Sequence, residues 1–151
     1  MTYFLDANIE RIDKESEEVI AKEPIAFIGQ PLAYLKQHKN EFIYLESKAF
    51  EPAGVEAVSI EADDVFGTYD VMLGLKLQKK WGHLIKEELN NSLMGNEAKF
   101  DLLFSHDDGL WDLNFALNYV FGFREEMTLE EAFELINQFL LNLVKKVKEK
   151  F

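Results

Sequence analysis

The stretch that decides the fold reads Trp111-Asp112-Leu113-Asn114-Phe115-Ala116-Leu117-Asn118-Tyr119. Every odd position holds a large apolar residue, and every even position holds a polar or small one. A period of two is typical of a β-strand with one buried face, because a helix would scatter these side chains around its axis. Burying each odd side chain is worth about 1.5–3 kcal/mol, so we expect this face of the strand to lie in the core.

The composition indicates one globular domain with a substantial core. The chain has 151 residues, of which 48% are hydrophobic and 13 are Phe. A chain of this length can bury about 68–70% of its unfolded surface, so residues 1–151 are expected to form a single domain. The sequence contains no cysteine. Disulfide bonds, thiol catalysis and thiolate-bound zinc are therefore excluded.

The charge balance argues against several classes of partner. Sixteen Lys and Arg residues against 28 Asp and Glu residues leave a formal net charge of −12. Such a surface repels polyanions, so we expect neither nucleic acid nor an anionic membrane as a partner. An acidic balance often serves solubility alone. The sharper alternative is a clamp for a basic polypeptide, such as an unfolded segment or a toxin.

No targeting or membrane signal is found in the sequence. The N-terminus lacks a basic region followed by an apolar run of about 7–15 residues, which would mark a signal peptide. No apolar stretch approaches the ~18–20 residues that a membrane span needs. We therefore expect a cytoplasmic protein.

Periodicity also predicts the elements before and after the deciding stretch. Alternation predicts strands at 41–46, 55–62, 69–77 and 100–104. Helical spacing predicts helices at 6–23, 31–37 and 79–93, the last one capped by Gly95. Residues 25–28 form either a short strand or a loop. At the C-terminus, Thr128 and Glu131 form a capping box before a wide apolar stripe, which predicts a helix from Thr128 to Lys150.

The order of these elements predicts an α+β fold. From Pro31 onward, a short helix is followed by three strands, a helix, two strands and a long closing helix. Because βαβ alternation is absent and tight turns are frequent, we expect a mostly antiparallel sheet of about five strands. The long C-terminal helix packs on one face of this sheet, which gives a two-layer sandwich. Residues 1–30 are expected to be an acidic N-terminal extension.

This element order, the acidity and the helix from Thr128 to Val147 resemble the class I type III secretion chaperones and their small bacterial relatives. The resemblance covers Leu32 to Val147, and the acidic stretch before Pro31 departs from the pattern. It implies a homodimer that holds an extended partner polypeptide on apolar patches. No functional residue is carried over from the family, because fold does not fix function.

The deciding stretch and the aromatic residues after it supply the candidate binding surface. Asp112, Asn114 and Asn118 form a polar row that is either a recognition surface or the wet face of a half-exposed sheet. Phe121 and Phe123 follow directly. If the final helix leaves them uncovered, they form an apolar rim of the kind found at interfaces.

Two acidic loops supply a candidate metal site. His106, Asp107 and Asp108, together with Asp63 and Asp64, offer imidazole and carboxylate ligands for a divalent cation. The same residue types are also ordinary turn formers.

The function classes follow from these candidates. The sequence contains no Gly-x-Ser-x-Gly, Walker or dinucleotide motif, so no cofactor is expected. The sequence favours a non-enzymatic acidic polypeptide-binding protein, chaperone-like or inhibitory. The alternative is a divalent-metal-binding protein or metal-assisted hydrolase.

Overall fold

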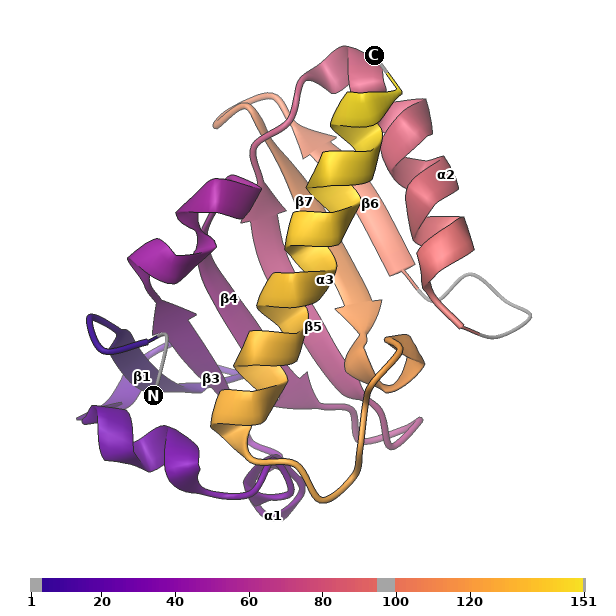
Figure 1. The fold of residues 1–151 in the computed structure, drawn as a ribbon. Helices are drawn as coiled ribbons and strands as arrows, with labels where there is room; N and C mark the ends of the chain where they lie inside the picture. The colour runs from indigo at the N-terminus through magenta and orange to yellow at the C-terminus, as the bar shows by residue number, and fades with distance from the viewer. Residues whose placement is uncertain (1–3, 95–99, 151) are drawn as a thin grey trace.

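Residues 4–94 and 100–150 are described by a computed structural model, in which seven strands form one antiparallel sheet (Figure 1). The strand order is β2-β1-β3-β4-β5-β7-β6. The strands are β1 (Asn8–Asp13), β2 (Val19–Glu23), β3 (Glu41–Glu46), β4 (Val55–Ala62), β5 (Tyr69–Leu75), β6 (Phe100–Ser105) and β7 (Leu110–Ala116). The α+β class and the antiparallel sheet are confirmed, but the sheet has two more strands than the five expected.

The helices lie on one face of this sheet. Figure 1 shows α3 running diagonally across it, with α2 beside α3 and the short α1 near one end. The helices are α1 (Tyr34–Gln37), α2 (Gly82–Ser92) and α3 (Leu129–Glu149), and the 3-10 turns are η1 (Ile25–Gly29), η2 (Lys48–Ala53), η3 (Lys79–Trp81) and η4 (Leu117–Tyr119). Within the described part of the chain, no helix is long and apolar enough to cross a membrane.

The deciding stretch is a strand, but it ends earlier than the alternation predicts. Trp111, Leu113 and Phe115 of β7 are buried in the core beneath the helices, as expected. The strand stops at Ala116, and the chain then turns into η4. The Oδ1 atom of Asn118 accepts the Tyr69 N–H at 2.8 Å, which ties this turn to the start of β5. A side-chain bond to a neighbouring strand thus replaces the last steps of the ladder.

The prediction of a helix over residues 6–23 is wrong, because these residues form the β1–β2 hairpin. Its turn is built by Asp13, whose Oδ1 accepts the N–H groups of Glu15 and Ser16 at 2.9 and 2.8 Å. Glu17 completes the reversal with a φ of 61°. β1 lies between β2 and β3, so the acidic N-terminal segment belongs to the same sheet as the rest of the chain.

The remaining elements match their predictions with shifted ends. The strands expected at 41–46 and 55–62 are β3 and β4, and those expected at 69–77 and 100–104 are β5 and β6. The helix expected at 79–93 appears as η3 followed by α2, whereas α1 is only the second half of the helix expected at 31–37. Residues 25–28 lie in η1 rather than in a strand. Gly95 lies outside the described residues.

The helix α3 begins as the capping box predicts. The Thr128 Oγ1 accepts the Glu131 N–H at 3.1 Å, and the Glu131 carboxylate accepts the Thr128 N–H at 3.0 Å. Its buried stripe seals one side of the core, where Phe139 meets Phe115 with ring centroids 5.0 Å apart. Among the described residues no helix covers the opposite face of the sheet, which we call the open face and which is the candidate site (Figure 1).

Candidate binding surface on the open sheet face

The strand register brings polar side chains from every strand onto the open face. Because directly opposed residues of antiparallel strands point to the same side, one row of neighbours can be followed across the whole sheet. This row consists of Lys22, Glu10, Tyr44, Ser59, Met72, Asn114 and Asp101. The open face is thus polar where the helix-covered face is apolar.

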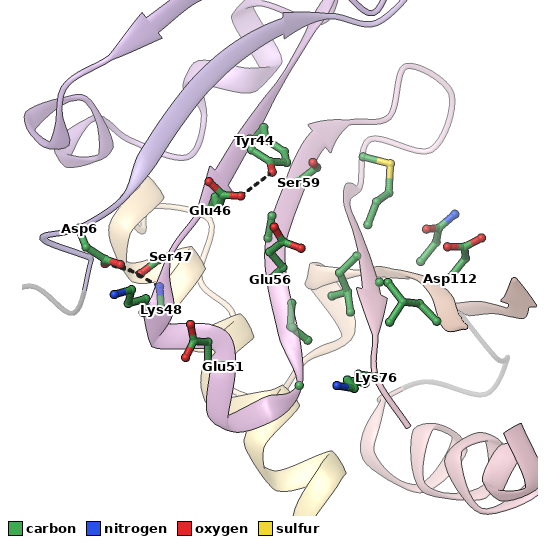
Figure 2. Close-up of a pocket in the computed structure, with 18 residues that line it drawn as sticks. Asp6, Tyr44, Glu46, Ser47, Lys48, Glu51, Glu56, Ser59, Lys76 and Asp112 are labelled. Atoms are coloured by element: carbon green, nitrogen blue, oxygen red, sulfur yellow. Dashed lines mark hydrogen bonds between the residues drawn. The ribbon is translucent and has the colours of Figure 1, made fainter. Parts of the chain in front are cut away.

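A hollow of about 1120 Å³ lies in the middle of this face, over β3, β4, β5 and β7 (Figure 2). Small residues form much of its floor, among them Ala57, Ser59 and Gly74. β4 contains a bulge here, because two residues between Val55 and Val58, Glu56 and Ala57, face the single residue Gly74 of β5. Bulges and strand glycines commonly mark places where another chain or a ligand approaches the backbone.

The rim of this central hollow is acidic. Its charged lining residues are Asp6, Glu46, Lys48, Glu51, Glu56, Lys76 and Asp112. Glu56 and Asp112 are exposed and have no hydrogen-bond or ion-pair partner among the described residues, whereas Glu46 only accepts a 3.5 Å bond from Tyr44. Figure 2 shows Glu56 in the centre of the view and Asp112 on the far side of β5.

Asp6 is the exception among these acids. Its carboxylate accepts the Ser47 hydroxyl at 2.7 Å and the Lys48 N–H at 2.9 Å. These bonds, led by the one from the Lys48 backbone, lower the pKa of Asp6. Asp6 therefore anchors the N-terminal segment to the start of η2. Because its carboxylate is already hydrogen-bonded within the fold, we do not count Asp6 among the groups available to a ligand.

A second hollow of about 550 Å³ adjoins the first near the β4–β5 turn. Met72 and Asn114 line both hollows, so the two are direct neighbours. Four carboxylates line the second hollow beside aromatic rings, and no Lys or Arg of the described residues does. These residues are Glu61, Asp63, Asp70, Asp101, Phe66, Phe100, Phe115 and Tyr119.

In the second hollow, the carboxylate of Asp70 is the one most clearly destabilised by its surroundings. Burial, together with the nearby charges of Asp63 and Glu61, raises the pKa of Asp70 to about 6. The Thr68 hydroxyl donates to Asp70 at 3.0 Å and opposes this shift only in part. A cation brought into this hollow would relieve the repulsion.

The residues predicted for binding divide into two groups. Asp112 and Asn114 lie on the open face, in the hollows, whereas Asn118 lies in η4 and uses its oxygen to hold Tyr69. Phe121 is 83% exposed, but Phe123 is half-buried and packs against Tyr69 with ring centroids 6.1 Å apart. The expected rim of two aromatic rings is therefore reduced to Phe121.

The two loops proposed for a metal lie at opposite ends of the sheet. Asp63 and Asp64 follow β4 at the end where Ala116 closes β7, whereas residues 106–108 precede β7 at its other end. The length of β7 separates them, which is about 20 Å. No group of three or more His, Cys, Asp or Glu suited to a metal ion occurs among the described residues. The structure therefore does not assemble His106, Asp107 and Asp108 with the other loop.

Backbone bonds occupy part of both loops. The Asp63 Oδ1 accepts the N–H groups of Val65 and Phe66 at 2.7 and 2.8 Å, and the Asp108 Oδ1 accepts the Leu110 N–H at 3.2 Å. Hydrogen bonds from these backbone groups lower the pKa of Asp63. This is the turn chemistry that the sequence also allowed.

Sequence reasoning missed the hollow and most of its rim, including Glu46, Glu56 and Lys76. The available signal was Gly74, which interrupts an otherwise apolar alternation in β5. Comparison with known proteins adds no candidate, because no family model, curated protein or solved structure matches the chain.

Proposed function

We propose that this chain is a non-enzymatic binding protein that holds a basic segment of another polypeptide on its open sheet face. The observation that carries the proposal is the pair of adjoining hollows, whose lining includes three carboxylates, those of Glu56, Asp112 and Asp101, without a hydrogen-bond or ion-pair partner among the described residues. Charged groups that a fold needs for itself are normally paired, whereas unpaired ones remain available to a ligand. Lys and Arg side chains supply the complementary charge.

The shape of the central hollow supports an extended segment. Its small floor residues let a second backbone approach the sheet, while Ser59 and Asn114 can hydrogen-bond to it. Opposite charge across an interface contributes mainly to specificity and association rate. Binding on this face should therefore be fast, and it should weaken as salt rises.

The first test uses an unstructured lysine-rich peptide of about twelve residues as the probe. We expect calorimetry with the full chain to show binding at about 50 mM salt and a loss of at least about tenfold in affinity at about 300 mM. A glutamate-rich peptide of the same length is the control and should not bind. Equal binding of both peptides would contradict the proposal.

A matched pair of variants separates the open face from net charge. Glu46→Gln with Glu56→Gln removes two charges from the rim, and each exposed pair is worth about 0.2–1 kcal/mol. We expect the affinity for the lysine-rich peptide to fall by about threefold to tenfold. Glu130→Gln with Glu149→Gln removes the same charge from α3, on the other side of the sheet, and should change it by less than about twofold. Equal losses of affinity in the two variants would mean that the peptide is attracted by net charge alone, which would contradict binding on the open face.

A further inference from the structure

The two edges of the sheet differ in how they are protected. The edge strand β2 has five residues, a register irregularity against β1, and the charged pair Lys22 and Glu23. Its Glu23 is held by Arg11 at 3.2 Å. Short strands, bulges and charges are the usual means by which proteins prevent an edge from pairing with another chain.

The opposite edge, β6, lacks these devices. Its sequence is Phe-Asp-Leu-Leu-Phe-Ser over Phe100–Ser105, with Asp101 as its only charge. All six residues pair with β7 in unbroken register. Leu103 is 70% exposed on the open-face side of this strand. A regular and mostly apolar edge with a single charge is a template for another strand.

We propose that β6 pairs antiparallel with β6 of a second copy of this chain, so that two sheets join into one. Residues directly opposed across a two-fold axis point to the same side of the sheet, which restricts the register. With the axis at Leu103, the two Leu103 side chains meet, Asp101 faces the Ser105 hydroxyl of the other copy, and Leu102 faces its Phe104. With the axis at Leu102, Leu103 would instead face the Asp101 carboxylate. Over residues 101–105 the first register pairs apolar with apolar and polar with polar side chains.

Self-complementarity favours a second copy over a basic polypeptide as the occupant of this edge. A basic segment would find a single carboxylate on β6, whereas the copy matches the side chains of residues 101–105 without placing like charges directly opposite each other. The pairing would leave the hollows of both copies on the same side of the joined sheet. This inference does not rest on the function proposed above.

The oligomeric state of the full chain tests this pairing. We expect sedimentation equilibrium to show a dimer in the micromolar range, and Leu103→Lys, which puts two ammonium groups opposite each other, to weaken dimerisation by at least about 30-fold. Val19→Lys places the same charge on the other edge, where half of the side chain is already exposed, and should leave the dimer unchanged. A monomeric wild-type chain at about 100 μM, or a dimer that survives Leu103→Lys, would overturn the proposal.

A cross-link tests the register directly. The chain has no cysteine, so Leu103→Cys introduces one thiol per copy, and directly opposed positions lie close enough for a disulfide. We expect mild oxidation to yield a covalent dimer within minutes, whereas Val19→Cys should stay monomeric on a denaturing gel. Similar yields from the two variants would overturn the assigned register.

Salt separates this proposal from the binding function. Joining two chains of the same net charge should become easier as salt rises, because repulsion is screened, whereas peptide binding should become weaker. The Glu46→Gln/Glu56→Gln variant should dimerise like the wild type. If the wild-type chain dimerises through β6 but binds no lysine-rich peptide, the dimer proposal is supported and the binding function is contradicted. If the chain binds the peptide but stays monomeric, the binding function is supported and the dimer proposal is contradicted.

Discussion

The carboxylates on the two faces of the sheet differ in what they contact. On the helix-covered face, Glu41 is only 2% exposed and is held by the Arg11 Nε at 2.9 Å and by the Tyr34 hydroxyl at 2.5 Å. On the open face, Glu56 and Asp112 have no such partner among the described residues. The buried carboxylate joins β1 to β3 and to the segment around α1, so its charge serves the fold.

The pKa values show the same contrast. Burial alone would raise the pKa of Glu41, but the hydrogen bonds from Arg11 and Tyr34 outweigh it and hold that pKa below its usual value. Asp70, in the second hollow, has its pKa raised to about 6 because burial and neighbouring acids act without a compensating base. The comparison shows that burial alone does not decide the role of a carboxylate. A carboxylate that is paired within the fold stabilises it, whereas one without a compensating base remains available to a partner.

Breaking the Arg11–Glu41 pair should give the largest effect on stability. Glu41→Gln leaves the guanidinium without its main partner, and we expect a loss of about 2–4 kcal/mol in the free energy of unfolding, measured with urea. Glu56→Gln is the matched change on the open face and should stay within about 0.5 kcal/mol of the wild type. Similar losses from both variants would remove the distinction between the faces.

Replacement of glycine by alanine should cost more stability in the core, at Gly82, than on the open face, at Gly74. A Cβ on Gly82 would lie 2.7 Å from the Trp111 indole in the core, so Gly82→Ala should cost about 1–2 kcal/mol despite its better helix propensity. A Cβ on Gly74 would meet the Leu110 side chain, with Cδ1 at 3.1 Å and Cβ at 3.8 Å. Gly74→Ala should therefore cost less than about 1 kcal/mol while lowering the affinity for the lysine-rich peptide severalfold. The opposite ranking in thermal unfolding would contradict this assignment.

The pH dependence of stability should have opposite signs at Asp70 and Glu41. The folded-state pKa of Asp70, about 6, lies above the ordinary aspartate value of 3.8, so the folded chain binds this proton more tightly than the unfolded chain does. Stability from Asp70 therefore falls as pH rises from about 4 to about 6, and Asp70→Asn should stabilise the chain by about 1 kcal/mol at pH 7, after allowance for solvent screening. Glu41, with a lowered pKa, contributes stability that is lost as the solution is acidified. Urea unfolding of Asp70→Asn at pH 4 and pH 7 checks this, and an equal effect at both would contradict it.

The smallest change concerns a buried hydroxyl with no partner. Tyr69 is fully buried on the helix-covered face, and its hydroxyl has no hydrogen-bond partner among the described residues. Removing an unsatisfied polar atom costs nothing, so Tyr69→Phe should match the wild type or exceed it by up to about 1 kcal/mol. A loss above about 1 kcal/mol in urea unfolding would mean that the hydroxyl is bonded in solution.

The elements that could be predicted are those whose signals are local. The alternation of residues 55–62 and the capping box at Thr128 each contain the information within a few positions, and the structure confirms both elements. The β1–β2 hairpin was not predictable in this way, because Arg11 is fixed by Glu41, 30 residues away. Four apolar residues in an acidic segment resembled a loose helix until that contact was known.

The candidate site depended even more on contacts between distant residues. Asp112 and Asn114 could be assigned to a polar face from β7 alone. The central hollow forms where the bulge in β4 lies beside Gly74 in β5. The sequence of either strand alone does not predict how the two strands pair. The carboxylates of the rim come from different segments of the chain, and only the strand register brings them together around the hollow.

The alternation along β7 has a consequence for redesign. Trp111, Leu113 and Phe115 hold the core, while Asp112 and Asn114 between them touch only the open face. A combinatorial library that randomises every second residue of the central strands would therefore sample new ligand preferences while leaving the hydrophobic interior intact. The scaffold thus lends itself to directed evolution of peptide recognition.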